Sequence, residues 1–348
     1  MAHAQLFHGA EGSANLALAL AYATYINCED KQADDSCGRC ASCVKMRKQI
    51  HPDFYHIFPV ASSKKVKEAG SDAFMPFWRK FLAENPYQTL PDWLDFIGAE
   101  NKQGNISAEE ARNVMKKITL KAFEAEYKIM ILWQPELLHA VAANALLKTL
   151  EEPPAKTVFL LVCNDANKLL TTILSRTQRI AIPTFKDEEI IQYLVDKQGV
   201  ELKKAKQVAY LSEGNLAKAI HLSGEHDNDR HTWFAEWMRQ CYKPDLIGLV
   251  RRADEFDGLS KENQKGMFDY ALNLFRDLFL FQNGAESLVR LADEELDFVQ
   301  KFSKAVKAAA VEFITQELSQ SHYHLERNAR AKMVFLDLSL TMARTFKK

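Results

Sequence analysis

The 348-residue sequence lacks any apolar run long enough to cross a lipid bilayer. Stretches such as VFLLVC at 158–163 are far shorter than the roughly 20 residues that a membrane helix needs. The N-terminal MAHAQLFHGA also lacks the basic segment and apolar core of a secretory signal peptide. These absences predict a cytoplasmic protein.

The chain also lacks an excess of charge of either sign, because 45 Lys and Arg face 46 Asp and Glu for a formal net charge of −1. No global field would draw it to nucleic acid or to an anionic membrane, so any DNA contact needs a local patch. The short basic clusters are typical of solvated helix faces, and they comprise Lys64, Lys65 and Lys67 and then Lys116, Lys117 and Lys121.

Cysteine is scarce, yet four of the six cysteines, Cys28, Cys37, Cys40 and Cys43, fall in the segment CEDKQADDSCGRCASC. Two-residue gaps let thiolates converge on one ion, and four thiolates complete a tetrahedral, structural zinc site. An iron–sulfur cluster is the alternative, because CGRCASC resembles part of a ferredoxin run. The upstream fourth cysteine and the lack of a following Cys-Pro favour zinc.

Short apolar runs alternate with helical patterns as far as Pro183, which predicts an α/β fold with a parallel sheet covered on both faces. The expected strands are QLFHG, FYHIFPV, YKIMILW, TVFLLVC and QRIAIP, and the expected helices include 13–26, HAVAANALLKTLEE and ANKLLTTILSR. From Asp187 onward only helices are expected, with Gly214 as the clearest break.

Two further features concern the segment between the second and third expected strands. The insert 64–104 contains many aromatic residues, so we expect it to pack as helix, and its sequence assigns it no function. After it, Ser107 and Glu110 in SAEE match a capping box, which predicts the start of a helix.

The N-terminal LFHGAEGSANLALALA has the outline of a phosphate-binding loop: a strand, then Gly9 and Gly12, then an Ala- and Leu-rich helix. In the frame G-x-x-x-x-G-K-S/T, Gly9 matches, but Ala14, Asn15 and Leu16 occupy the Gly, Lys and Ser/Thr positions. Without the lysine ammonium the phosphates lose a point charge, and without the hydroxyl Mg²⁺ loses a ligand.

Several motifs together resemble the bacterial DNA polymerase III clamp-loader subunits. The run NALLKTLEEPP is highly specific to them, and LLTTILSRTQ matches their LLPTIxSRCQ pattern with Thr177 in place of cysteine. The four-cysteine module followed by HPD also belongs to this group. The resemblance implies an AAA+ domain at 1–183 with the zinc module at 28–43, a helical lid at 184–226, and a helical collar for oligomerisation at 227–348.

The family contains ATPase subunits, gamma and tau, and a delta-prime subunit that resembles them without hydrolysing ATP. After the YKIMIL strand, Trp133 and Gln134 replace the aspartate and glutamate of the active members, and Ala217 replaces their lid arginine. With the lysine also missing, the resemblance implies a delta-prime-like ring scaffold with no productive ATP binding. Its partners would be gamma/tau and delta and, through the assembled complex, the sliding clamp and primer-template DNA.

Arg176 is the one catalytic position that the family pattern retains. The resemblance implies that it is an arginine finger inserted into a neighbouring subunit's ATP site, with Ser175 in support. A guanidinium there stabilises the charge on the transferring phosphoryl group.

Two other functions remain open on the sequence: an active gamma/tau-type ATPase with an aberrant loop, and a zinc-dependent nucleic-acid-binding protein. His51 and Asp53 could suggest an acid–base pair, but their spacing around a proline favours a turn after the cysteine module. Trp233 and Trp237, four residues apart, are expected in the collar core rather than in a base-stacking platform.

Overall fold

A computed structural model of the chain describes residues 1–63, 66, 70–99, 102–119, 121–224, 227–289, 291, 293–327 and 329–347. The chain divides into two compact units. The first contains residues 1–190 and 214–220, and the second contains residues 191–213 and 221–348. The boundary therefore passes through the expected lid, and the three-part division at 183 and 226 stays a prediction.

The first unit is built on a five-stranded parallel sheet in the order β2-β3-β4-β1-β5. All five expected strands are present: β1 (Ala4–His8), β2 (Phe54–Ile57), β3 (Lys128–Trp133), β4 (Thr157–Cys163) and β5 (Gln178–Ala181). β1 lies between β4 and β5, with Leu6 opposite Leu161 and Arg179. The turn that follows β1 therefore lies beside the carboxyl end of β4.

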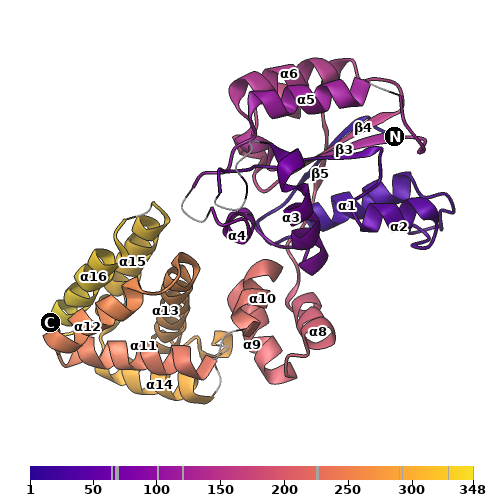
Figure 1. Ribbon diagram of the computed structural model, residues 1–348. Coiled ribbons are helices and arrows are strands. Elements are labelled where there is room, and N and C mark those ends of the chain that lie inside the picture. The colour runs from indigo at the N-terminus through magenta and orange to yellow at the C-terminus, as the bar shows by residue number, and fades with distance from the viewer. Residues whose placement is uncertain are drawn as a thin grey trace. The chain divides into compact units, whose positions relative to one another are not determined.

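Helices cover both faces of this sheet, as predicted (Figure 1). Ile129, Ile131 and Trp133 of β3 face one side, while Met130 and Leu132 face the other, because side chains alternate along a strand. The helices on the first side are α1 (Asn15–Ile26), α2 (Ala41–Arg47), α3 (Ser71–Glu84) and α4 (Leu90–Phe96). Those on the second side are α5 (Ala108–Thr119), α6 (Ala140–Glu151) and α7 (Thr171–Leu174).

The insert packs through its aromatic residues, as expected, and in its described part it contains α3 and α4. Phe74, Trp78, Phe81 and Trp93 are fully buried and stack or meet edge to face with one another. Trp78 also lies 5.1 Å, centroid to centroid, from Trp133 at the end of β3. The insert thus covers the end of β3, where the active members of the family that the sequence resembles carry an aspartate and a glutamate.

Two local predictions need correction. The expected helix ANKLLTTILSR is broken, because Leu169 and Leu170 are extended between a 3-10 turn at Ala166–Lys168 and the four-residue α7. At the start of α5, Ser107 Oγ accepts from Glu110 N as a cap would. The Glu110 carboxylate, however, accepts from Ser71 N at 2.8 Å, so it joins α5 to α3 instead of completing a capping box.

Helices alone follow the sheet, in the part of the chain that the structure describes. They are α8 (Asp187–Gln198), α9 (Leu202–Ser212), α10 (Leu216–Gly224), α11 (Asp227–Tyr242), α12 (Leu246–Asp257), α13 (Lys261–Gln282), α14 (Asp293–Ala305), α15 (Ala308–Glu326) and α16 (Ala331–Thr345). A short 3-10 turn at Glu286–Leu288 lies between α13 and α14, and another, at Pro135–Leu137, follows β3 in the first unit. Gly214, between α9 and α10, has φ +82°, as a helix break requires.

The core of the second unit is rich in aromatic rings. Trp237 is fully buried against Phe335 and Phe268 and donates its Nε1–H to Ser339 Oγ at 2.8 Å. Trp233 is partly buried against the same core, so both tryptophans pack as predicted.

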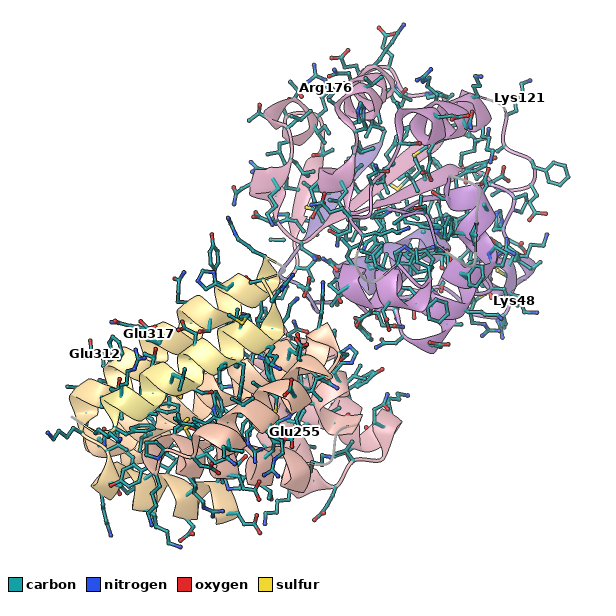
Figure 2. All side chains as sticks on the ribbon, turned by 60° about the vertical axis from the view of Figure 1, so that its left-hand side comes forward. Lys48, Lys121, Arg176, Glu255, Glu312 and Glu317 are labelled. Carbon is teal, nitrogen blue, oxygen red and sulfur yellow. The ribbon has the colours of Figure 1, made fainter. Side chains whose placement is uncertain are left out.

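Charged side chains line the surfaces of both units, such as Lys48 and Lys121 on the first and Glu255 and Glu312 on the second (Figure 2). Among the described helices, none has the length and apolarity needed to cross a membrane.

His56 on β2 generates a prediction about pH. Its ring is buried, its Nδ1 accepts from Trp78 Nε1 at 3.2 Å, and burial lowers its pKa from 6.5 to about 3. In the unfolded chain His56 therefore binds a proton near pH 6.5, whereas in the folded chain it remains neutral at that pH. This contribution to stability is complete above pH 6.5 and is lost as the pH falls towards 3.

We expect the free energy of unfolding to fall by about 1.4 kcal/mol more in the wild type than in His56→Gln between about pH 7.5 and 5.5. Urea unfolding followed by circular dichroism measures this difference. Contributions from the other ionisable groups are common to both proteins and cancel. Equal losses in the two proteins would contradict the assignment.

Candidate functional site

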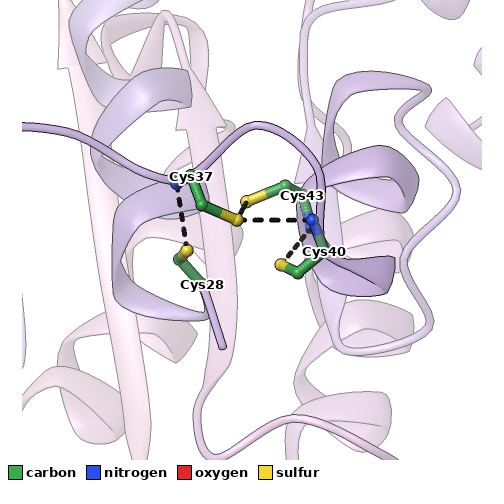
Figure 3. Close-up of side chains that lie close together, drawn as sticks. All are labelled: Cys28, Cys37, Cys40 and Cys43. Carbon is green, nitrogen blue, oxygen red and sulfur yellow. Dashed lines mark hydrogen bonds between the residues drawn. The ribbon is translucent and has the colours of Figure 1, made fainter. Parts of the chain in front are cut away.

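Four cysteine sulfurs form a cluster between α1 and α2 (Figure 3). The Sγ atoms of Cys28, Cys37, Cys40 and Cys43 all lie within 4.8 Å of one another, and those of Cys37 and Cys43 are 4.0 Å apart. A metal ion bonded to four thiolates at about 2.3 Å places the sulfurs about 3.8 Å apart. The cluster could therefore bind a metal ion after only a small contraction.

Backbone N–H groups already point at the sulfurs, as in a metal knuckle. Cys37 N lies 3.2 Å from Cys28 Sγ, and Cys40 N lies 3.3 Å from Cys37 Sγ. Gly38 makes the turn possible with φ +68°, a conformation that other residues rarely adopt. The N–H groups of Arg39 and Cys40 lower the pKa of Cys37 to about 7, whereas burial raises that of Cys43 to about 12.

His51 and Asp53 anchor the cysteine module to a distant loop. The predicted turn is present, since His51 Nδ1 accepts from Asp53 N at 3.1 Å. The buried Asp53 carboxylate also accepts from the backbone N–H groups of residues 123, 124 and 125 at 2.6 to 2.9 Å. Burial alone would raise the pKa of Asp53, but these three donors lower it. Its carboxylate therefore serves the packing of the loop.

The phosphate-loop outline is present, and Asn15 fills it with hydrogen bonds. The Asn15 Nδ2 donates to Gly9 O at 3.4 Å, to Cys163 O at 3.2 Å and to Asn164 Oδ1 at 3.2 Å. Its Oδ1 accepts from Leu16 N at 2.8 Å. The buried side chain thus joins the turn after β1 to the end of β4, and it carries no charge for a phosphate.

The start of α10 closes the loop from the other side. Leu216 N donates to Gly12 O at 3.1 Å. A Cβ on Gly12 would lie only 1.9 Å from Asn215 Oδ1, and Gly12 has φ +74°. Only glycine therefore fits at Gly12, and Asn215 occupies the space directly over the turn.

The other positions at which an ATPase needs polar groups are also buried. Trp133 is 2% exposed and packs against Trp78 and Phe81 of the insert. Gln134 is buried with a left-handed backbone, and its N–H donates to Val162 O at 2.8 Å. Ala217 on α10 is 2% exposed.

Glu136, two residues further on, lies beside the end of β4. Its Oε1 accepts from Asn164 N at 3.4 Å, and burial raises its pKa.

Arg176 follows α7 and bonds within its own chain. Its Nη1 donates to Thr172 O at 2.8 Å and to Ser175 Oγ at 3.3 Å, and its Nη2 forms an ion pair with Glu151 at the end of α6. Ser175 Oγ donates to Thr172 O at 3.1 Å. Ser175 therefore contacts Arg176, and the roles expected for the two residues stay predictions.

The structure thus gathers the cysteines into one cluster, and Gly9, Gly12 and Asn15 into one loop. Sequence reasoning missed Asn164, Asn215 and Glu151. Asn164 could have been found, because polar residues at the carboxyl ends of parallel strands often form sites. Of the basic clusters, Lys64, Lys65 and Lys67 lie outside the described residues, and Lys117 pairs with Asp72.

Comparison with known proteins identifies the family. The model of the family described as "DNA polymerase III, delta subunit" matches residues 1–186. A delta' subunit of DNA polymerase III from Yersinia pestis is 24% identical over 329 residues, which cover 93% of this chain and 83% of the relative. Another delta' subunit, from Escherichia coli strain K12, is 29% identical over 174 residues, covering 50% of this chain and 40% of the relative.

A tau subunit of DNA polymerase III from Bacillus subtilis strain 168 is similar to nearly the whole chain. It is 25% identical over 356 residues, which cover 96% of this chain and 55% of the relative. The chain thus spans most of the Yersinia relative and about half or less of the other two. The family model matches more than half of the chain, so the chain belongs to the family described as DNA polymerase III, delta subunit, and its relatives include the clamp-loader delta' subunits.

Proposed function

We propose that this chain is the non-hydrolysing delta' subunit of a DNA polymerase III clamp loader. It would stand in a ring beside gamma/tau and delta and would act on the sliding clamp and primer-template DNA through the assembled complex. Residues 1–183 would form the AAA+ module, 184–226 the lid and 227–348 the collar. The observation that carries the proposal is the neutral Asn15 amide, bonded within the loop where an ATPase carries its lysine.

The loss of ATP chemistry rests on several independent positions. Asn15 offers no charge to phosphates, Trp133 offers no ligand to Mg²⁺, and Ala217 offers no guanidinium from the lid. Phosphoryl transfer depends almost wholly on such charges, because the protein has little covalent chemistry to perform. Asn215 also fills the space over Gly12. We therefore infer that the chain does not hydrolyse ATP.

Arg176 would serve catalysis in a neighbour. Its side chain is 32% exposed, so it is available at the surface of the first unit (Figure 2). An arginine finger supplied in trans raises the rate of phosphoryl transfer by about 10³ to 10⁵ in well-studied cases. Thr172 and Ser175 hold one nitrogen of the guanidinium and thereby restrict its orientation.

The four cysteines would hold a structural zinc ion. All four ligands are sulfurs, which leaves no position for a water or a substrate. The ion would fix the loop between α1 and α2. Its stabilisation would come from closing the loop, as in other small zinc modules.

Similarity to tau supports an active ATPase as the alternative, since it covers almost the whole chain. An active site would need Asn15 to leave its bonds and would still lack a lysine. The delta' assignment therefore has the stronger support.

The metal assignment predicts one zinc ion per purified chain, measured by plasma mass spectrometry. Cys40→Ser removes one thiolate and should lower the bound metal to less than half of the wild-type content. Cys241→Ala, at a buried cysteine outside the cluster, should retain the wild-type content. Stoichiometric iron in the wild type, or unchanged zinc in Cys40→Ser, would overturn the assignment.

Titration of the isolated chain with Mg·ATP should give neither saturable tight binding nor turnover. Asn15→Lys should remain inactive, because Trp133, Gln134 and Ala217 still lack the other groups. Calorimetry and phosphate release measure the two properties, with a gamma subunit as the positive control. Tight binding with turnover by the wild-type chain would establish the gamma/tau-type alternative.

In a reconstituted loader, Arg176→Ala should reduce DNA-stimulated ATP hydrolysis at the adjoining site by up to about 10³-fold. Arg176→Lys should restore little, because an ammonium lacks the planar fork. The matched control is Arg179→Ala, which changes an exposed arginine three residues away and should leave the rate unchanged. An unchanged rate in Arg176→Ala would remove the finger assignment.

A further inference from the structure

The Arg176 guanidinium is already paired within its own chain. Nη2 contacts the carboxylate of Glu151, while Nη1 donates to Thr172 O and Ser175 Oγ. Among the described residues, the Nε–H of Arg176 has no hydrogen-bond partner. One carboxylate therefore balances the charge of the guanidinium, and the Nε–H edge of the guanidinium is free to bind another acceptor.

Glu151 comes from a different helix than Arg176 does. It is the last residue of α6, next to the buried Leu150, whereas Arg176 follows α7, which is packed down through the buried Ile173. Leu150 and Ile173 belong to the same apolar core. The packing of α7 beside the end of α6 therefore places the Glu151 carboxylate within reach of the Arg176 guanidinium.

We propose that Glu151 is a latch on Arg176, which neutralises the guanidinium in the free subunit and yields it to the phosphate of a nucleotide bound by the neighbour. The proposal rests on the proposed function, because it takes Arg176 to be the finger. Glu151 itself touches no nucleotide; it acts on the reaction through Arg176.

Electrostatics supports an exchange of partners. A carboxylate and a phosphate are both anions, so they compete for one guanidinium, and the phosphate carries more charge. The side chains of Arg176 and Glu151 are 32% and 49% exposed. Ion pairs at such exposure shift an equilibrium by only about two- to fivefold, so a phosphate can displace the carboxylate readily. The open Nε edge gives the phosphate a first contact before Glu151 departs.

The opposite role, in which Glu151 orients Arg176 for catalysis, predicts the opposite effect. Glu151→Gln keeps the shape and the hydrogen-bond acceptor but removes the charge. If Glu151 is a latch, Glu151→Gln releases Arg176 more readily and should raise the rate of ATP hydrolysis. If Glu151 orients Arg176, the same variant should lower that rate. The sign of the effect therefore distinguishes the two roles.

The first test uses the isolated full-length chain and needs no loader. Arg176 is labelled with phenylglyoxal, and the rate is followed by mass spectrometry of the peptide that contains it. Glu151→Gln should raise the labelling rate about two- to fivefold, because the free guanidinium is more accessible. Glu152→Gln, at the adjacent exposed glutamate, should leave it unchanged. Equal rates in Glu151→Gln and the wild type would overturn the latch.

The second test uses the reconstituted loader with the same variants. Glu151→Gln should lower the KM for ATP or raise the rate about two- to fivefold, and Glu151→Gln with Arg176→Ala should match Arg176→Ala alone. A lower rate in Glu151→Gln would overturn the latch and assign Glu151 an orienting role. If Arg176→Ala itself changes nothing, the finger proposal fails, while the labelling result still reports on the ion pair separately.

Discussion

The side-chain amide of Asn15 holds together the part of the molecule on which the site depends. It bonds the turn after β1 to the carboxyl end of β4 by donating to Gly9 O, Cys163 O and Asn164 Oδ1. These hydrogen bonds hold the shape of the loop. A positively charged side chain at this position would have to be stabilised by an anion, whereas an amide is satisfied by the protein itself.

Other polar groups of the first unit also form their hydrogen bonds within the chain. Asn215 fills the space over Gly12, and the Asp53 carboxylate uses three backbone donors to hold residues 123–125. The cysteine sulfurs accept from N–H groups of their own turns. The Asn15 amide and the Asp53 carboxylate are thus satisfied by the chain itself, which suits a subunit whose proposed role is structural.

The sequence allowed the sheet, its two covered faces and the cysteine cluster to be predicted, because each depends on local periodicity or spacing. Contacts between distant segments could not be predicted. The Glu110 carboxylate accepts from Ser71 N at the start of α3, and Trp133 packs on Trp78, because the folded insert brings these pairs together. The helix after β4 was predicted as continuous because its residues have helical propensity, yet Leu169 and Leu170 are extended and divide it into a 3-10 turn and the short α7. No pattern in the sequence around either residue predicts the ion pair between Glu151 and Arg176, which are 25 residues apart.

The aromatic cluster around Trp133 bears on how this chain could change in evolution. An aspartate at that position would place a carboxylate among Trp78, Phe81 and other buried rings, with no partner for its charge. A single substitution back to a metal-binding residue would therefore damage the core before it could help catalysis. A carboxylate at this position would require the insert to be repacked first, so the stability of the fold opposes a metal site here.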